Sequence, residues 1–490
     1  MSYTQEVVRG SAMYFVGGIL AAGIAYLTKL VLVRNLTVEE YGLFFAVFTF
    51  VLFFTVFRSL GMNQGLARFI AEYSLTKRFP EIKSLIVGSA LLQFIVSSIV
   101  VIVVWLLAPW LAENYFGSSD AIWLLRVMIL YLPLMILSSN TRSVLQGFKI
   151  ISWYSFADLA DNLLVLLLII GGLLLGFEVY SAAIGYLGSI ILFFLVFGFV
   201  VVKKTKIFSY KQKNFFSENK KLLLFSLPLL LTATGSTIIS YFDTLMLTYF
   251  DTILEVGVYN IVYPSSMLLA IIGGSLGAIL LPVITQMWVS EKKKETGKAL
   301  EIMYVYVFAL ILPAIIVLSI FSKELLGLFF GSEYVIGAAA FSVLLVGGMF
   351  SAIIAINNQV LVAIEKPKQT MSVYFIGSIA NIALNLVLIP QYSLLGAAIA
   401  SVLSFLLMIV VSLYYIKEDI HIRLPVRKIV LCLVSAASIP FVIQQLMNLL
   451  STHIYVSAII SSAVAGVAYL GLLFLLRVIR VREIIHLYKS

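Results

Sequence analysis

The sequence predicts an all-α polytopic membrane protein with about 14 transmembrane helices. Three observations support this fold class. Hydrophobic residues make up 62% of the 490-residue chain and charged residues 11%, and the mean hydropathy is +1.09, far from the average of soluble proteins. Apolar stretches long enough to cross a bilayer recur along the whole chain. The lysines and arginines lie almost entirely in alternate gaps between these stretches.

Each predicted span is a run of about 20 mostly apolar residues, the length that a helix needs to cross the hydrocarbon core. In chain order, the spans cover residues 11–33, 41–61, 84–108, 121–140, 154–175, 179–202, 222–246, 256–281, 300–321, 336–359, 369–390, 394–416, 429–447 and 454–476. The first run is too long for a signal-peptide core and lacks a small-x-small cleavage pattern, so we expect it to remain as a span. No segment between spans is large enough to bury the core of a separate catalytic domain.

The distribution of basic residues predicts the orientation. Of the 33 lysines and arginines, 28 fall in segments on the same side as the N-terminus. Two lie in opposite loops, Arg34 and Lys323, and three lie within spans, Lys29, Arg58 and Arg126. This is the positive-inside pattern, so we expect both termini in the cytoplasm. The net charge of +10 therefore indicates topology and contact with anionic membrane lipids rather than a nucleic-acid partner.

The chain repeats itself at an offset of about 215 residues. Residues 37–44 (TVEEYGLF) match 252–259 (TILEVGVY), and Ala-Ala-Ile at 182–184 recurs at 397–399. Each copy holds an even number of spans, so the copies are parallel repeats, an arrangement found among secondary transporters. The predicted organisation is a six-helix lobe at 1–202, a basic cytoplasmic linker at 203–221, a second six-helix lobe at 222–416, and helices 13 and 14 with a cytoplasmic tail at 417–490.

Two long motifs carry a family resemblance. Residues 32–44 (LVRNLTVEEYGLF) and 59–69 (SLGMNQGLARF) resemble the opening signature of the polysaccharide flippases. These are the Wzx-type members of the multidrug/oligosaccharidyl-lipid/polysaccharide exporter superfamily. In the second half, residues 241–247 (YFDTLML), 256–263 (VGVYNIVY) and 281–283 (LPV) are similar to the family's seventh and eighth spans.

The resemblance implies a fold and a task. The fold is MATE-like, with two six-helix lobes around a V-shaped cavity that opens alternately to either side, and it implies a working monomer. The task is to move a polyprenyl-pyrophosphate-linked oligosaccharide from the cytoplasmic to the outer leaflet of the cell membrane. The chain lacks the arginine-rich first-span pattern associated with lipid II flippases. A capsule, O-antigen or exopolysaccharide repeat unit is therefore the expected cargo, before the peptidoglycan precursor.

Polar and charged side chains within spans are costly, so they are candidate functional residues. Cations near the outer ends of spans can bind a pyrophosphate or acidic sugars, although a long side chain can also reach the headgroups instead. Asparagines can bind sugar hydroxyls or bridge helices. The predicted cavity residues are Lys29, Arg34, Arg126, Asp243, Asn357, Asn381 and Asn385. For Arg58, near the inner end of the second span, we expect the side chain to extend to the cytoplasmic interface.

Asp158 and Asp161 are three residues apart in the fifth span, so they share one helical face. They could pair with Arg58, take up a proton or bind Na⁺. Neighbouring carboxylates disfavour simultaneous ionisation, which suits coupling to protons. A structural ion pair is the alternative. Near Asp243, Pro228 and several hydroxyl residues predict a bend in the seventh span.

Three other functions compete with the flippase interpretation. A drug or cation antiporter shares the implied fold. The first two spans carry Lys29 and Arg58 and no carboxylate, which favours an anionic cargo over a cationic drug. A membrane-embedded polymerase or glycosyltransferase would need a larger external or nucleotide-sugar-binding region. A scaffold role would make the cavity charges dispensable. The sequence has no Walker motif and no Cys/His cluster, so we expect no direct use of ATP, no cofactor and no bound metal, apart from coupling to H⁺ or Na⁺. Because no large loop is present, we also expect no enzyme activity. Other polysaccharide-assembly proteins are candidate partners.

Overall fold

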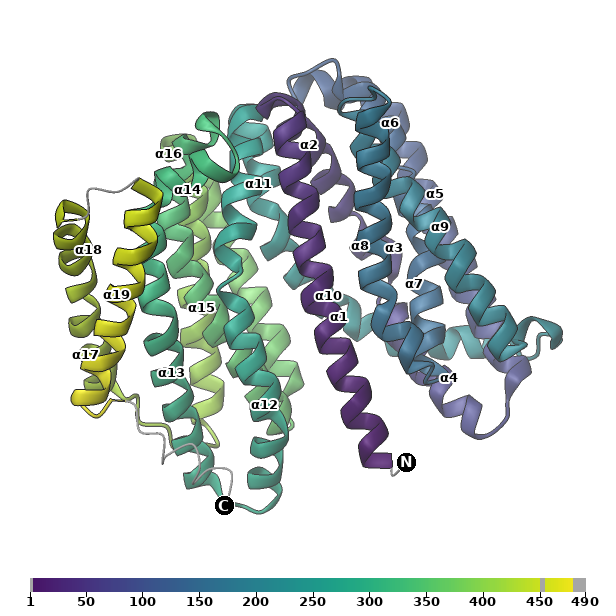
Figure 1. Cartoon of the computed structure of the whole chain (residues 1–490). Helices are drawn as coiled ribbons and strands as arrows, with labels where there is room; N and C mark the ends of the chain where they lie inside the picture. The colour runs from purple at the N-terminus through teal and green to yellow at the C-terminus, as the bar shows by residue number, and fades with distance from the viewer. Residues whose placement is uncertain (1–2, 450–453, 479–490) are drawn as a thin grey trace. The chain divides into compact units, whose positions relative to one another are not determined.

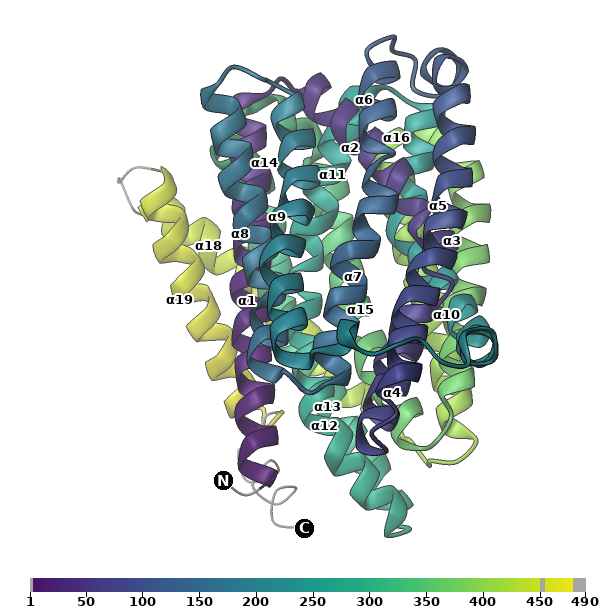
Figure 2. The same cartoon turned by 90° about the vertical axis from the view of Figure 1, so that its right-hand side faces the viewer.

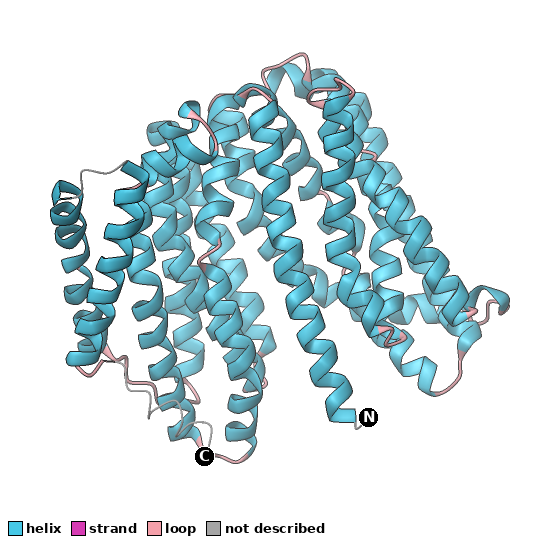
Figure 3. Cartoon of the chain, viewed as in Figure 1, coloured by secondary structure: helices cyan, strands magenta, loops and turns pink. Residues whose placement is uncertain are grey.

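The computed structural model describes residues 3–449 and 454–478, and in this part of the chain every regular element is helical (Figure 3). The chain divides into two compact units, Met1–Gly257 and Val258–Ser490. The first unit contains α1 (Tyr3–Asn35), α2 (Val38–Phe53), α3 (Thr55–Ser59), α4 (Met62–Leu75), α5 (Phe79–Asn114), α6 (Ala121–Met128), α7 (Tyr131–Gly147), α8 (Ile151–Leu174), α9 (Tyr180–Thr205), η1 (Ile207–Ser209) and α10 (Phe215–Phe250), together with the start of α11 (Ile253–Met267). The second contains the rest of α11 and α12 (Ala270–Val289), α13 (Lys293–Ile320), α14 (Ser322–Phe329), η2 (Ser332–Gly337), α15 (Ala338–Ala363), α16 (Pro367–Lys417), α17 (Val426–Ala436), α18 (Ser438–Leu449) and α19 (Ile454–Leu475).

The helices confirm a multi-pass membrane protein. Within the described residues, 12 helical segments are long and apolar enough to cross a bilayer, and α10 makes a thirteenth when its two halves count as one span. These halves, Phe215–Leu230 and Ala233–Phe250, meet at a bend of 48°, which confirms the bend expected near Pro228. The fold class predicted from the sequence is therefore correct.

Helix α16 contains two of the predicted spans. Its backbone leaves the helical region at Ser393, where φ is 52° and ψ is −131°. A Cβ added to Gly377 would lie 2.4 Å from Cγ of Met408, yet a straight helix would hold these two residues about 46 Å apart. The chain therefore reverses between the predicted spans 369–390 and 394–416, and counting these separately restores the predicted 14.

In the first unit, α8 packs against α1 on one side and α9 on the other, and α7 packs against α4 and α9 (Figure 1). Helix α2 begins with a capping box: the Thr37 side chain accepts from the Glu40 backbone N–H, and the Glu40 carboxylate accepts from that of Thr37. One turn further on, α2 meets the start of α11 through glycines. A Cβ on Gly42 would lie 2.1 Å from the carbonyl oxygen of Ile253, and one on Gly257 would lie 3.2 Å from Cα of Gly42. Gly42 and Gly257 occupy equivalent positions in the sequence repeat, so two equivalent positions contact each other.

The segment predicted as a basic linker lies against the start of α5 (Figure 2). Lys83 Nζ donates to the carbonyl oxygens of Phe208 and Tyr210, at 2.8 and 2.7 Å. Ser84 Oγ donates to the carbonyl oxygen of Lys213, at 2.8 Å. These bonds hold the chain between α9 and α10 on the first unit.

A buried carboxylate then fixes the first turn of α10. Glu218 accepts from Tyr73 Oη at 2.5 Å, Arg78 Nη2 at 3.1 Å and Lys221 Nζ at 3.1 Å. Burial, followed by the hydrogen bond to Glu218, raises the pKa of Tyr73 to about 12. Helix α10 consequently belongs to the compact unit that ends at Gly257, although the repeat assigns it to the second lobe; the predicted domain limits remain a prediction.

In the second unit, glycines allow α12 to approach α15 closely: a Cβ on Gly273 would lie 2.3 Å from Cα of Ala352. Helices α17, α18 and α19 occupy the region predicted for spans 13 and 14 and pack beside α13 (Figure 1). Between α15 and α16, Lys366 Nζ lies 2.5 Å from Oδ2 of Asp419 and 2.6 Å from Oε2 of Glu418. The hydrogen bonds to Asp419 and then Glu418 raise the pKa of Lys366.

Candidate functional site

Arg142 on α7 is the partner of the predicted carboxylate pair on α8. Its Nη2 lies 2.6 Å from Oδ2 of Asp161, and its Nε lies 3.3 Å from Oδ1 of Asp158. The Asp158 side chain is 48% exposed and that of Asp161 is 21% exposed. Of the alternatives for these carboxylates, pairing with Arg58 is wrong, because both carboxylates pair with the guanidinium of Arg142.

Arg58 on α3 lies inside the first unit, so its expected extension to the interface is also wrong. The residue is only 2% exposed. Its Nη1 donates to Oε1 of Gln93 on α5 and to Oγ of Ser139 on α7, both at 3.2 Å. Gln93 Nε2 in turn donates to Oδ1 of Asn140, at 3.4 Å. The guanidinium is thus surrounded by neutral side chains, and within the described residues no carboxylate pairs with it.

The helical span that carries Arg58 ends directly after it, beside α10. Helix α2 ends at Phe53, and the short α3 ends at two left-handed residues, Leu60 with φ 45° and Gly61 with φ 69°. A Cβ on Gly61 would lie 2.4 Å from the carbonyl oxygen of Ser226, so only glycine allows α10 to approach here. Phe54 between α2 and α3 keeps right-handed helical dihedrals, so Val38–Ser59 forms one span. Arg58 lies in the last turn of this span and faces α5 and α7.

Aromatic rings surround the Arg142 cluster. The Arg142 guanidinium carbon lies 4.6 Å from the centroid of the Phe193 ring on α9, a cation–π contact. Tyr131 and Tyr186 lie within electrostatic reach of Asp161. Their rings pack against Phe48 of α2, at centroid distances of 5.3 and 4.5 Å. The cluster therefore joins α2, α7, α8 and α9 through charged and aromatic contacts.

The three predicted outer cations have different surroundings. Lys29 Nζ lies 4.9 Å from the centroid of the Phe45 ring on α2. Arg34 is exposed in the last turn of α1. The guanidinium carbon of Arg126 lies 4.4 Å from the ring centroid of Trp105 and 5.5 Å from that of Trp123, and both tryptophans are exposed. Tryptophans often lie at the membrane interface. The position of Arg126 therefore agrees with a contact to lipid headgroups as well as with a site in the cavity.

Asp243 is buried on α10, in the half of the helix that follows the 48° bend. The neighbouring hydroxyls bond to their own helix: Thr234 Oγ1 donates to the carbonyl oxygen of Leu230 and Ser240 Oγ to that of Ser236, at 2.8 and 2.9 Å. Such local bonds satisfy backbone groups around a bend.

In the second unit, the predicted asparagines are buried. Asn357 accepts from Tyr304 Oη at 2.6 Å and donates to Ser412 Oγ at 2.7 Å, which joins α13, α15 and α16. Asn385 Nδ2 donates to Oδ1 of Asn381, at 3.1 Å. These bonds fit the interhelical alternative, and the role of the asparagines in binding sugar stays a prediction.

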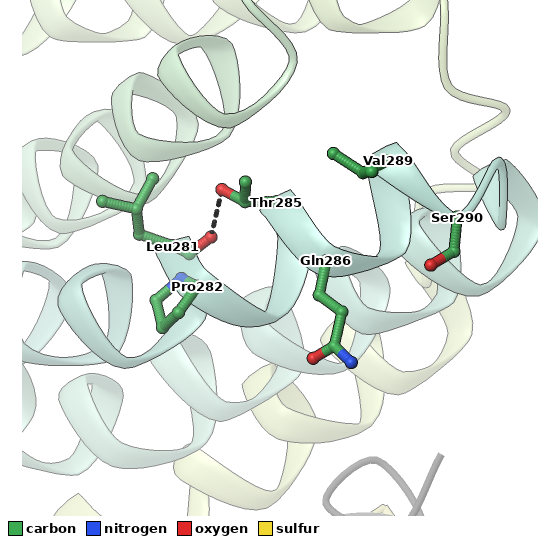
Figure 4. A pocket seen from close by; sticks show the side chains of 6 residues that line it. All are labelled: Leu281, Pro282, Thr285, Gln286, Val289 and Ser290. Atoms are coloured by element: carbon green, nitrogen blue, oxygen red, sulfur yellow. Dashed lines mark hydrogen bonds between the residues drawn. The ribbon is translucent and has the colours of Figure 1, made fainter. Parts of the chain in front are cut away.

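One depression of about 510 Å³ lies along α12 (Figure 4). Its lining is formed by Leu281, Pro282, Thr285, Gln286, Val289 and Ser290. The Thr285 hydroxyl donates back to the carbonyl oxygen of Leu281, at 2.8 Å. The lining contains no charged residue and none of the predicted site residues.

The sequence reasoning missed Arg142, Gln93, Ser139 and Asn140. The span predicted at 121–140 ends before Arg142, whereas α7 continues to Gly147. The run Ser138–Ser143 contains six polar residues, which ended the apolar pattern without ending the helix. Gln93 is the amide within the apolar third span and could have been recognised by that signal. Within the described residues, no group of three or more metal-ligating side chains occurs.

Comparisons with known proteins agree with this architecture. A family model described as polysaccharide biosynthesis protein matches residues 7–288, and a MatE model matches residues 228–387. An uncharacterized membrane protein of Methanocaldococcus jannaschii is 27% identical over 99% of this chain and 98% of its own length. A probable low-salt glycan biosynthesis flippase of Haloferax volcanii is 21% identical over 88% of each chain.

Two solved structures show the fold. A lipid II flippase in an inward closed conformation aligns over 98% of this chain and all of its own, with a TM-score of 0.76 and 18% identity. An inward-facing multidrug resistance MATE transporter aligns over 81% of this chain and 95% of its own, with a TM-score of 0.66 and 15% identity. The fold is therefore MATE-like, as the resemblance implied. Because the polysaccharide biosynthesis model matches more than half of the residues, the chain belongs to that family, the flippases of the multidrug/oligosaccharidyl-lipid/polysaccharide exporter superfamily.

Proposed function

We propose that this protein flips a polyprenyl-pyrophosphate-linked oligosaccharide from the cytoplasmic to the outer leaflet of the cell membrane, by alternating access, for surface polysaccharide synthesis. Its relatives support a glycan cargo, since they include a probable flippase of glycan biosynthesis and a putative O-antigen transporter of Shigella flexneri, which is 27% identical over 37% of this chain. The main structural observation that supports an anionic cargo is the buried side chain of Arg58.

Arg58 is suited to an anionic head group. A buried guanidinium without a carboxylate is costly, because its desolvation is offset only by dipoles. Gln93 and Ser139 provide hydrogen bonds but no negative charge. A pyrophosphate would supply that charge through short, charge-assisted bonds. A cationic drug would meet repulsion at the same place, so Arg58 favours the flippase over the antiporter.

The predicted cavity residues complete the proposal. Lys29, Arg34 and Arg126 would attract the pyrophosphate or acidic sugars, while Asp243, Asn357, Asn381 and Asn385 would bind sugar hydroxyls. We place both termini in the cytoplasm, on the basis of the positive-inside pattern, and we propose a monomer that exchanges cargo with polysaccharide-assembly proteins.

Coupling to H⁺ or Na⁺ would act at Asp158 and Asp161. Protonation of Asp161, or its binding of Na⁺, would weaken the pair with Arg142 and release the contact between α7 and α8. A cation that moves inward across 100 mV supplies about 2.3 kcal/mol, comparable with the strength of a hydrogen bond to a charged group. Replacing both aspartates by asparagine should remove the response of transport to an imposed ion gradient.

Proteoliposomes containing the purified protein and a polyprenyl-pyrophosphate oligosaccharide test the function directly. An impermeant reagent that cleaves the exposed glycan measures translocation. Arg58→Gln should reduce the rate at least tenfold, while Arg68→Gln, which removes an exposed arginine of the same unit, should transport like wild type. Wild-type protein that leaves the cargo on its original leaflet, yet exchanges organic cations for protons, would overturn the flippase in favour of an antiporter. Equal rates for wild type and Arg58→Gln would remove Arg58 from the mechanism.

A further inference from the structure

A groove on the first unit combines apolar walls with a pair of lysines. It has a volume of about 740 Å³ and lies between the start of α8 and the last turns of α9. Trp153 comes from α8, and Val196, Phe199 and Val200 come from α9, with Lys203 and Lys204 at the end of α9. A second depression of about 400 Å³ shares Trp153 and Val196 and continues along α8 past Phe156 and Ala160. Together they form one elongated groove.

The floor of this groove is aromatic and its rim is exposed. Phe197 is buried, and its ring stacks on that of Phe193 at 4.2 Å between centroids, while Trp153 packs edge-on against Phe197 at 5.5 Å. By contrast, Val196 is 52% exposed and Phe199 is 65% exposed. The packed rings of Trp153 and Phe197 line the part of the groove along α8, and the exposed rim leaves the groove accessible from the surrounding membrane.

Charge distinguishes one end of the groove from the other. Lys203 and Lys204 are exposed in the last turn of α9, and Lys203 Nζ lies 6.0 Å from the centroid of the Phe199 ring. Trp153 lies in the first turn of α8, the positive end of that helix dipole. Toward Phe156 and Ala160 the lining contains no charged residue. One end therefore suits an anionic group, and the remainder suits a hydrocarbon chain.

We propose that this groove binds one phospholipid with an anionic head group from the cytoplasmic leaflet. The phosphate and head group lie beside Lys203 and Lys204, and one hydrocarbon chain lies on Trp153 and Val196. Basic residues attract anionic lipids at a membrane surface generally, but a groove with apolar walls beside the lysines would hold a single molecule in a defined position. The site is separate from Arg58, which is buried among α3, α5 and α7, so it does not depend on the proposed cargo.

Native mass spectrometry of the purified full chain in detergent tests this site. The protein is titrated with phosphatidylglycerol or with phosphatidylcholine of the same acyl chains. Wild type should bind one phosphatidylglycerol at least tenfold more tightly than phosphatidylcholine. Lys203→Gln/Lys204→Gln should weaken this binding about 30-fold, because each basic residue near the surface contributes about 1 kcal/mol. Val196→Trp, which fills the groove and keeps both lysines, should also remove the bound lipid.

Lys293→Gln/Lys294→Gln is the matched control, because it removes two adjacent exposed lysines at the start of α13. This control should bind phosphatidylglycerol like wild type. Equal losses in the two double variants would mean that net charge, and no defined site, attracts the lipid. Unchanged binding in Val196→Trp, or equal affinity for the two lipids, would also overturn the proposal.

Discussion

Replacing Gly42 by alanine tests how closely α2 and α11 approach. The new Cβ would lie 2.1 Å from the Ile253 carbonyl oxygen and 3.1 Å from the backbone nitrogen of Gly257. Because both contacts are with backbone atoms, no side-chain rotation relieves them, and the two helices must move apart. Overpacking of this kind costs about 1–3 kcal/mol, while alanine regains about 1 kcal/mol of helix propensity over glycine. The expected net loss of stability is about 0–2 kcal/mol.

A matched control separates these two contributions. Gly23 on α1 is exposed, and a Cβ there meets nothing within 4 Å, so Gly23→Ala should be stabilising by about 1 kcal/mol. The difference between the two variants isolates overpacking, and we expect it to be about 1–3 kcal/mol. The assay is the free energy of unfolding in mixed detergent micelles, measured by tryptophan fluorescence. If Gly42→Ala is as stable as Gly23→Ala, the close contact of α2 with α11 is refuted.

Three further predictions concern polar contacts. Arg142→Gln should lower the free energy of unfolding by about 1–2 kcal/mol, which is the range for a partly exposed ion pair with a charge-assisted hydrogen bond. In a double-mutant cycle, the variant that also carries Asp161→Asn should lose less stability than the sum of the two single losses. Asn357→Leu should cost about 1–3 kcal/mol, because it removes the hydrogen-bond partner of the buried Tyr304 hydroxyl and also the bond to Ser412. A smaller loss when Tyr304→Phe is already present would confirm the bond that the two residues share. The pKa of Lys366 is raised in the folded protein, so its ion pairs stabilise the fold fully below the ordinary pKa of 10.5. This contribution is lost as the pH rises through the higher pKa of the folded state. The free energy of unfolding of wild type should therefore fall more steeply in alkali than that of Lys366→Met.

The sequence could predict the spans because membrane helices are recognised by length and apolarity alone. Residues 154–175 became α8 at Ile151–Leu174, and residues 179–202 became α9 at Tyr180–Thr205. The reversal inside α16 was also predictable, since charge alternation requires two spans there. These features depend on local composition, which the sequence states directly.

The site was less predictable because the surroundings of a side chain depend on which helices pack together. The distance of Arg58 from the end of its span predicts a position at the interface. Arg58 instead bonds to Gln93 of α5 and Ser139 of α7, and the sequence alone does not indicate that these helices cover it. Arg142 was missed for a different reason: a polar helical turn and a polar loop have the same composition, and only tertiary packing distinguishes them.

The reversal within α16 also has a consequence for how the chain is made. A Cβ on Gly396 would lie 2.2 Å from the Leu388 carbonyl oxygen, so the two helices are joined with almost no loop between them. A connection this short keeps the joined ends of the two helices together once both have formed. We therefore expect them to insert as a helical hairpin, with residues 367–417 as a single unit of membrane insertion during synthesis.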